Sequence, residues 1–520
     1  MNIQTSLLSS VLAAGLIGAA APASAQEDDT LRMVIAAPMQ VLNPQRITSV
    51  LAASVLKLAV EQLTIVGTEG TMQPLLAESW EVEEGGLSWL VTLREGVIFH
   101  DGTPFDAEAA VANFEYLMTT DVPIPGRTHL GPISGAEVVD EHTIRVTTTE
   151  PFSGFPIALS HYAASMLSPA SLANGAADSG SEVIAGTGPF KMESFQLPDR
   201  VTLVRNDDYW GGAPGMARIE AISRADEQTR LATFLSGEAD AVFYISPEGL
   251  RQAESDPSVK TEIKPAIRQF LLQLPFGMPV IQDKNVRLAM NHAIDREQIV
   301  ETVYRGTASP AMAAIGPGVI GFREEYVYSY DPDKALALLA ESGWTPGEDG
   351  ILEKDGEDFP AIPFLASRGR YPSDARLSQI VAGYLRQIGI PTDLRIEEFA
   401  TFFADARAGA QEGNEMVQMS WGFPQMDGAA FLCAVYRPGE TYNFGAYQNE
   451  RVEQACNAID ATFDAQERAQ IIADANKAVY DDAGAVFLIS NSYIVGMRDN
   501  ISGIELHSGE SHRYQEAMRQ

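Results

Sequence analysis

The chain has 520 residues, of which 36 are Lys or Arg and 70 are Asp or Glu, so its formal net charge at pH 7 is −34. Nucleic acid and anionic membrane surfaces repel such an acidic chain, which excludes both as partners. Hydrophobic residues make up 45% of the chain, which excludes a disordered protein. The length of the chain suffices for two or three domains with sizeable cores.

The first 25 residues have the features of a cleaved secretory signal. They contain no charged side chain, and an apolar run from Leu7 to Ala21 ends at Ala23-Ser24-Ala25, an A-x-A cleavage site. The run is short for a membrane span, so a membrane anchor is the weaker alternative. No Cys lies near the cleavage point, so the protein is not expected to be a lipoprotein. Removal of residues 1–25 leaves 495 residues, and we expect this mature chain in an exported compartment.

Strand and helix patterns alternate along the chain, which is typical of an α/β protein. Residues 80–93 predict a hairpin, and a meander through residues 97–99 leads into a helix that Asp106 caps. Further strands are expected at residues 143–148, 201–204, 240–243, 362–365, 394–396 and 416–420. Further helices are expected at residues 227–235, 286–304, 332–342, 374–388 and 464–480.

No catalytic motif is present in the chain. The sequence contains no G-x-S-x-G, H-E-x-x-H or phosphate-binding loop, and its seven histidines never pair at the spacing of metal ligands on a helix. His292 lies on a predicted helix and is expected to be structural. We therefore expect a protein that is not an enzyme and has neither cofactor nor metal. A secreted hydrolase with a triad assembled from distant residues is the alternative.

Cys433 and Cys456 are the two cysteines of the chain. In an oxidising compartment they are expected to form a disulfide across 23 positions, with two free thiols as the alternative. A metal site requires more ligands than this pair supplies.

The segment Trp421 to Gly428 follows the predicted strand at residues 416–420. Loops at the carboxyl ends of strands in α/β sheets commonly hold ligands, so Asp427 is a candidate partner for an ammonium group. An exposed loop acid without a ligand is the equally weighted alternative.

Arg368 and Arg370 follow the predicted strand at residues 362–365 and precede a helix. An arginine at this place can bind a carboxylate through two parallel hydrogen bonds. An exposed charge at the start of the helix is the alternative reading.

Several longer motifs occur in a fixed order along nearly the whole mature chain. They are Leu76–Trp80 (L-A-E-S-W), Phe99–Phe105 (F-H-D-G-T-P-F), Gly186–Phe190 (G-T-G-P-F), Arg205–Trp210 (R-N-x-x-Y-W), Gly237–Asp240, Val286–Ala289, Ile294–Arg296, Tyr330–Pro332 and Tyr442–Gly445. In this combination and order the chain resembles the family 5 solute-binding proteins of ABC transporters, the dipeptide, oligopeptide and nickel group.

The resemblance implies an α/β, two-lobed periplasmic-binding-protein fold (type II, cluster C) with an additional inserted domain. Two lobes are joined by crossing strands in this fold. Lobe I is then expected at residues 30–68, 186–277 and 488–520, the inserted domain at residues 69–185, and lobe III at residues 278–487. The motif Phe99–Phe105 is expected to shape the inserted domain.

The function implied by the resemblance is that of a receptor for an ABC importer. A monomer captures a peptide-like or other zwitterionic organic solute between its lobes, closes about a hinge, and delivers the solute to permease subunits in the inner membrane. A nickel-chelate, sugar or opine receptor of the same family is an alternative. So is a receptor that hands its ligand to a signalling partner or acts as a chaperone.

The resemblance also implies roles for the candidate site residues. Asp427 corresponds to an acid that anchors the amino group of a peptide, and Arg368 or Arg370 to an arginine that anchors its carboxylate. Trp421 and Phe423 are expected to supply apolar walls. The family has a second acid after the Trp, which this chain lacks. No histidine is near the loops at residues 368–371 and 421–428 in the sequence, which favours an organic solute over nickel.

Overall fold

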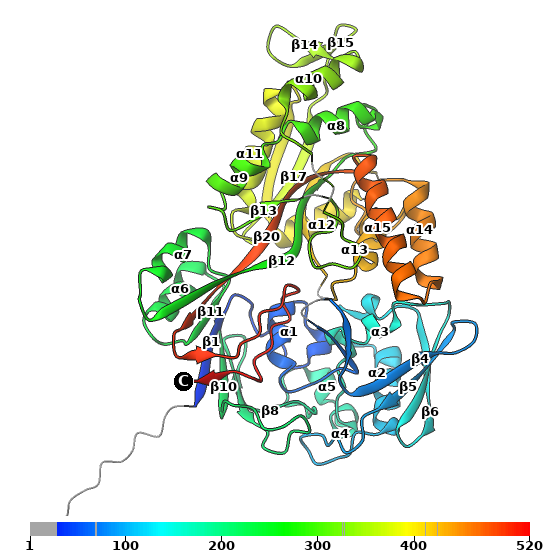
Figure 1. The fold of residues 1–520 in the computed structure, drawn as a ribbon, viewed down its shortest axis with the longest axis vertical. Helices are drawn as coiled ribbons and strands as arrows, with labels where there is room; N and C mark the ends of the chain where they lie inside the picture. The colour runs from blue at the N-terminus through cyan, green and yellow to red at the C-terminus, as the bar shows by residue number, and fades with distance from the viewer. Residues whose placement is uncertain are drawn as a thin grey trace, which may run out of the picture.

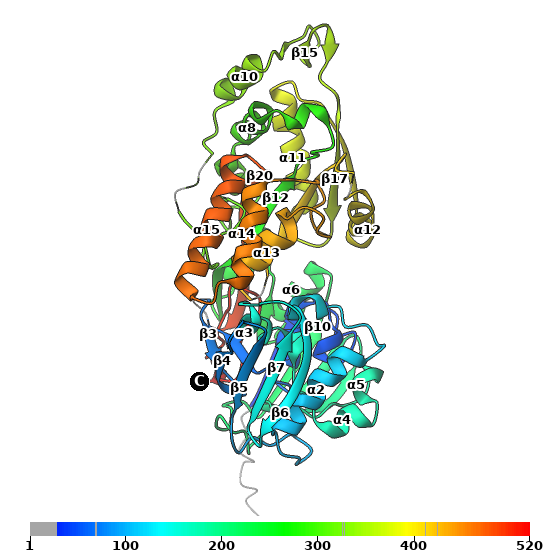
Figure 2. The same cartoon turned by 90° about the vertical axis from the view of Figure 1, so that its right-hand side faces the viewer.

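Two bodies joined by two long strands make up the molecule. The structure is a computed structural model that describes residues 29–520 except 68–69, 312, 325, 327, 411 and 424, so the predicted signal at residues 1–25 lies outside the described residues. We call residues 29–258 and 499–520 the lower body, and residues 274–484 the upper body (Figures 1 and 2). The strands β12 (Val259–Gln273) and β20 (Ala485–Arg498) run through both bodies. The expectation of a two-lobed α/β fold is confirmed.

One sheet of eleven strands extends from the upper body into the lower body. In the upper body β17 pairs in parallel with β18 and β19, and in the lower body β1 pairs in parallel with β10 and β11. A short strand, β13 (Ser309–Pro310), pairs with β20 beside the main path. The strand order along that path is β18 (Thr392–Glu398), β17 (Ile362–Arg368), β19 (Met416–Trp421), β12, β20, β11 (Ala241–Phe243), β1 (Thr30–Ile35), β10 (Arg218–Ser223), β9 (Arg200–Arg205) and β8 (Phe190–Gln196).

The antiparallel pairing of β12 with β20 carries the connection between the bodies. The register runs from Val259 opposite Arg498 to Gln273 opposite Ala485 and shifts between Pro265 and Gln269. Proline has no N–H to donate to a sheet, so an interruption of the ladder at this place is expected. The two strands therefore bend where they pass from one body into the other.

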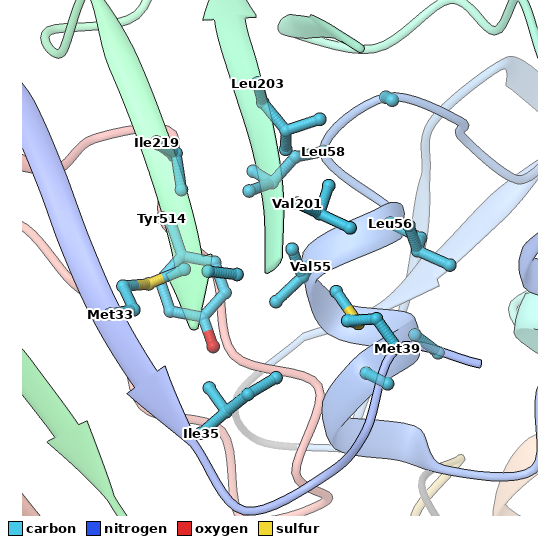
Figure 3. Close-up of a cluster of buried hydrophobic side chains, with 14 of the residues drawn as sticks. Met33, Ile35, Met39, Val55, Leu56, Leu58, Val201, Leu203, Ile219 and Tyr514 are labelled. Atoms are coloured by element: carbon cyan, nitrogen blue, oxygen red, sulfur yellow. The ribbon is translucent and has the colours of Figure 1, made fainter. Parts of the chain in front are cut away.

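Helices cover both faces of the lower part of the sheet. Figure 3 shows one face, where Val55 and Leu56 of α1 (Val50–Leu56) lie against side chains of the sheet and Tyr514. The opposite face packs against α6 (Glu227–Leu235) and α7 (Pro247–Glu254). Burial of apolar side chains on both faces fixes the lower body as a layered unit.

A separate four-stranded antiparallel sheet stands beside these layers. Its order is β4 (Ala77–Val82), β5 (Ser88–Leu93), β7 (Thr143–Thr148) and β6 (Ile133–Asp140), with α2 (Ala107–Thr119) packed against it. The predicted hairpin and the helix capped by Asp106 are confirmed. Residues 97–99 form no strand, because Ile98 makes only an isolated bridge to Pro104. The sheet lies within the range predicted for the inserted domain, whose boundaries stay a prediction.

The motifs that repeat the family pattern hold the lower body together. The carboxylate of Glu61 is buried and accepts hydrogen bonds from Thr187 (2.7 Å), Tyr209 (2.7 Å) and Trp210 (3.0 Å), which belong to two of these motifs. His100 of a third motif hydrogen-bonds to carbonyl groups at residues 186 and 188. These residues are architectural, as expected for Phe99–Phe105.

The upper body holds most of the long helices. Where one helix was predicted for residues 286–304, the chain forms α8 (Lys284–His292) and α9 (Arg296–Thr302). That prediction is wrong because Asp295 caps α9 by accepting a hydrogen bond from the N–H of Gln298 at 2.8 Å. The other helices are α10 (Pro332–Glu341), α11 (Asp374–Gln387), α12 (Phe399–Gly409), α13 (Gly428–Tyr436), α14 (Glu450–Ala461) and α15 (Ala465–Asp481). None of the helices in the described ranges combines the length and the apolar character that a bilayer crossing requires.

Gly188 offers a test of this architecture. A Cβ atom at this position would lie 2.3 Å from the carbonyl oxygen of Leu58, whereas a Cβ atom at Gly383, in the exposed middle of α11, would meet nothing within 4 Å. We expect Gly188→Ala to lower the free energy of unfolding by about 1–3 kcal/mol, because backbone must move. Gly383→Ala should raise it by about 0.5–1 kcal/mol. Urea denaturation measures both, and equal effects would contradict the packing described.

Candidate functional site

A cavity of about 450 Å³ lies between the two bodies. From the lower body it is bordered by the 3-10 helix η2 (Arg127–Leu130) and by α3 (Phe155–Ala158) with the chain before it. From the upper body it is bordered by the loop after β19, by α13 and by residues 440–442. Its volume falls in the range of roughly 300–1,000 Å³ that is usual for small-molecule sites. Charged and hydroxyl-bearing residues in its wall are Thr128, Arg407, Asp427, Glu440, Thr441, Tyr442, Asp460 and Arg468.

Phe423 and Trp421 occupy different depths of the upper wall. Phe423 lines the cavity, and its ring stacks parallel to that of Trp421 with centroids 6.3 Å apart. Trp421 lies behind it, packed on Tyr442 at 4.9 Å, and its indole N–H is buried without a partner among the described residues. Phe423 is therefore the apolar surface that faces the cavity, and Trp421 supports it.

Asp427 lines the cavity but already has a strong partner. Its two carboxylate oxygens accept hydrogen bonds from Arg468 at 3.0 and 2.8 Å, and one of them also caps α13 at Ala429. Both side chains are buried, with exposed fractions of 4% for Asp427 and 6% for Arg468. Burial favours the neutral form of Arg468, but the charge and hydrogen bonds of Asp427 raise the pKa of the guanidinium above its usual value.

Arg468 connects the two bodies as well. Its Nε donates to the hydroxyl of Ser153, which belongs to the lower body, over 3.0 Å. Ser153 in turn donates to the carbonyl groups of Ile459 (2.7 Å) and Asp460 (2.8 Å) in the upper body. Burial raises the pKa of the nearby Asp460 carboxyl to about 6. Sequence reasoning placed Arg468 on a helix and gave no sign of its role, because its hydrogen-bond partners Asp427 and Ser153 lie on two distant segments.

The two predicted arginines differ in their surroundings. Arg368 ends β17, is exposed, and pairs with Glu398 at 3.2 Å. Arg370 is also exposed, and its guanidinium stacks on Tyr371 and Phe399, each at 5.4 Å. Tyr371, on which Arg370 stacks, also accepts a hydrogen bond from Arg268, so Arg370 lies near the crossing strands, and its charge lowers the pKa of Glu510. Neither arginine is among the described residues that line the cavity.

Two histidines of the lower body approach the loop at residues 421–428. The ring of His129 lies 5.7 Å from that of Phe423 and 4.7 Å from that of His161. The expectation that no histidine is near this loop is therefore wrong in space, because residues some 300 positions apart meet across the gap. Burial lowers the pKa of both imidazoles, so they are neutral at pH 7. Across the described ranges, no three His, Cys, Asp or Glu side chains are arranged to hold a metal ion.

A buried ion pair lies where the strands pass between the bodies. Arg268 of β12 binds Glu510 at 3.0 and 2.9 Å and donates to the hydroxyl of Tyr371 at 3.1 Å. Tyr493 of β20 also donates to Glu510, at 3.2 Å. Burial alone raises the pKa of Glu510, but the charges of Arg268 and Arg370 hold it below its usual value. The C-terminal segment is thereby fastened to both crossing strands.

A disulfide stiffens one wall of the cavity. Cys433 and Cys456 are bonded, with Cα atoms 5.7 Å apart, and join α13 to α14. Closure of a loop of 23 residues stabilises the folded state by about 3 kcal/mol in the chain-entropy account. Since Cys433 lines the cavity, the bond ties this part of the wall to α14.

Comparison with known proteins places the chain among receptors. The family described as bacterial extracellular solute-binding proteins, family 5 middle, matches residues 71–443. The chain is 26% identical over 492 residues to the glutathione-binding protein GsiB of Salmonella paratyphi A, and the match covers 93% of each protein.

Solved structures share the fold over nearly their full length. The structure of NikA from Brucella suis in complex with Fe(III)-EDTA has a TM-score of 0.82 and 26% identity, covering 94% of this chain and 100% of that one. The dipeptide binding protein from Pseudoalteromonas sp. SM9913 in complex with Met-Leu has a TM-score of 0.77 at 21% identity, covering 94% and 100%.

The ion pair of Asp427 and Arg468 predicts unequal effects for two of the candidate anchors. Asp427→Asn leaves a buried guanidinium without its counter-charge, and we expect the free energy of unfolding to fall by about 3 kcal/mol. Arg368→Ala removes an exposed pair and should change it by less than about 1 kcal/mol. Urea denaturation of the solute-free variants measures both. An Asp427→Asn variant as stable as Arg368→Ala would show that the buried pair contributes little.

Proposed function

The chain belongs to the bacterial extracellular solute-binding proteins of family 5, and we propose that it captures a peptide-like, zwitterionic organic solute for an ABC importer. The observation that carries this proposal is the cavity of about 450 Å³ with walls from both bodies. A solute held there touches the lower and the upper body at once. Its binding energy therefore favours the closed arrangement over one in which the bodies are apart.

The contacts that hold the bodies together beside the cavity are small enough to open. Ser153 of the lower body donates a hydrogen bond to the carbonyl group of Ile459 in the upper body. The ring centroid of Phe463 in the upper body lies 5.8 Å from that of Trp89 in the lower body. The exposed pair of Arg305 with Glu248 (2.9 Å) and the packing of Met426 on Val66 also join the bodies. The chain itself crosses only in the bent pair of strands, so a hinge motion that breaks these contacts exposes the cavity without unfolding either body.

The lining favours a solute that has charges of both signs and apolar parts. The cavity wall contains two acidic side chains, Asp460 and Glu440, and the cationic side chain of Arg407. Phe423 adds an aromatic surface. The relative GsiB is named as a glutathione-binding protein. Glutathione is a tripeptide with one ammonium and two carboxylate groups, and a solute of this type suits the size and the lining of the cavity.

Among the residues predicted as anchors, we propose Asp427 for an ammonium group and Arg370 for a carboxylate. A carboxylate offers about four acceptor positions, and Arg468 and Ala429 leave one for a solute. Arg370 has no carboxylate partner within ion-pair distance among the described residues, whereas Arg368 is held by Glu398. Phe423 is proposed as the apolar contact, with Trp421 behind it.

Location and partners follow from the same proposal. We propose that the mature chain begins after residue 25 and acts as a monomer in the periplasm. There it docks on permease subunits in the inner membrane. Cell fractionation with N-terminal sequencing checks the first part, and solute uptake in a strain without the neighbouring permease checks the last. Uptake that does not depend on the permease would favour a receptor for a signalling partner.

A thermal-shift screen tests the proposed function. The mature protein is screened with glutathione, di- and tripeptides, opines, sugars and nickel chelates. Each solute is then recovered, and its mass is measured by mass spectrometry. We expect glutathione or a peptide to stabilise the protein, by about 2.7 kcal/mol at one hundred times Kd, and to return intact. A chemically altered solute would support the hydrolase alternative. Stabilisation by nickel chelates alone would indicate a nickel-chelate receptor, with His129 and His161 close to the bound solute.

Arg368→Ala and Arg370→Ala form a matched pair for the same screen. Both remove an exposed arginine, and the two lie two positions apart. Arg368 is paired with Glu398, whereas Arg370 has no carboxylate within ion-pair distance among the described residues. We expect weaker binding for Arg370→Ala and unchanged binding for Arg368→Ala. Equal affinities in both variants would remove Arg370 as an anchor.

A further inference from the structure

Lys57 is a cation that no neighbouring group neutralises. It directly follows α1, which lies beside the C-terminal segment in Figure 1. Its Nζ donates to the hydroxyl of Ser511 over 3.1 Å. Within the described part of the chain, no carboxylate lies within ion-pair distance of this ammonium. Its charged or titratable neighbours are His161, His507, Arg513 and Tyr162, which are neutral or positive at pH 7. Burial and the charge of Arg513 lower the pKa of Lys57 to about 8.

The ammonium faces a small hollow between the bodies. The hollow measures about 20 Å³, which is room for one or two water-sized groups. Lys57 and Ser511 border it from below, and Gln425 borders it from above, after β19. Gln425 also lines the cavity of about 450 Å³, so the hollow and the cavity share this residue as a wall.

The other polar groups of the hollow are donors or can become donors. Gln425 has an exposed fraction of 4%, and its amide oxygen has no partner among the described residues. An amide that turns over presents its NH2 group at the same place. The Nδ1 of His161 accepts a hydrogen bond from the N–H of Ala163 at 3.1 Å. The neutral ring therefore carries its proton on Nε2, where it can donate.

A carboxylate group is the chemical partner that this set lacks. Lys57 is half-buried. Partial desolvation of an ammonium without an anion is costly, and a natural protein tolerates it where a ligand supplies the charge. The hollow admits a group of two or three atoms, and the larger cavity beside it admits the remainder of a peptide-like solute. Because Gln425 comes from the upper body, all the donors meet only when the bodies are together.

We propose that Lys57, with Gln425 and His161, binds a carboxylate of the solute whose remaining atoms occupy the cavity of about 450 Å³. The inference rests on the proposed function and adds to it an anchor from the lower body. The solute class is then restricted to peptide-like molecules with a free carboxylate. Such a solute neutralises Lys57 in the closed arrangement, which links recognition to closure.

Lys57→Met tests the anchor with two readouts that move in opposite directions. Methionine is one atom shorter than lysine, and the variant removes a half-buried charge that has no carboxylate within ion-pair distance among the described residues, so we expect a higher Tm without solute. Its affinity for glutathione should fall roughly tenfold to a hundredfold, the usual effect of losing a hydrogen bond to a charged group. Lys57→Gln is a second uncharged variant. Lys477→Met is the control, since Lys477 is exposed and paired with Asp481.

Matched solutes show whether the carboxylate is what Lys57 recognises. Wild-type protein is titrated with glutathione and its glycine ethyl ester, and with tripeptides and their C-terminal amides. We expect the free acids to bind more tightly, and Lys57→Met to lose most of this preference. Equal binding of acid and amide by the wild-type protein overturns the inference and leaves the proposed function standing. If no carboxylate-bearing probe stabilises the wild-type protein, the inference falls together with the peptide-like solute.

The pH dependence adds an independent readout. A carboxylate binds the protonated lysine, so wild-type affinity should hold below about pH 8 and decline above it as Lys57 loses its proton. Lys57→Met should lack this decline. Titration of the solute affects both proteins equally, so it cancels when the two affinity profiles are compared. His161, His507 and Arg513 face the same group in both proteins, so they cancel in the comparison. Identical profiles would contradict the role of Lys57.

Discussion

The antiparallel pairing of β12 with β20 is the constraint on which the rest of the structure depends. Each strand contributes its hydrogen bonds to sheet layers in both bodies, so neither body is complete without them. The register shift after Pro265 concentrates the bend in a few residues, next to the buried pair of Arg268 and Glu510. A hinge of this kind lets two rigid bodies move while their cores stay intact.

Solute capture follows from what the hinge brings together. The loop after β19 belongs to the upper body, and it meets η2, α3 and the end of α1 from the lower body. Aromatic packing behind Phe423 and the pairing of Asp427 with Arg468 fix this loop, so the cavity wall is preformed. A preformed wall reduces the ordering entropy lost on binding.

The sequence predicted the local elements well and the site only in part. Periodicity located the hairpin before residue 94 and the helices α6, α11 and α15, because these elements are set by their own residues. The break between α8 and α9 was missed, since the apolar pattern continues across the cap at Asp295. The loop position of Asp427 was found, whereas its partner Arg468 was not. A pairing between side chains 41 positions apart leaves no local signal.

Residues of the lower body that face the loop escaped sequence reasoning for the same physical reason. His129, His161 and Lys57 stand in unremarkable local patterns, and only the folding of the chain places them opposite Phe423 and Gln425. The longest motifs, by contrast, are engaged in the network around Glu61, away from the cavity. The motifs around Glu61 therefore mark the architecture, whereas Tyr442 of another motif lines the cavity.

The most direct test of this account is a crystal structure of the mature protein with a solute that stabilises it. Electron density for the solute should fill the cavity between the bodies. It should touch His129 or Thr128 on one side and Phe423 or Tyr442 on the other. A solute bound outside this cavity, or held by residues of one body alone, would contradict capture by closure about β12 and β20.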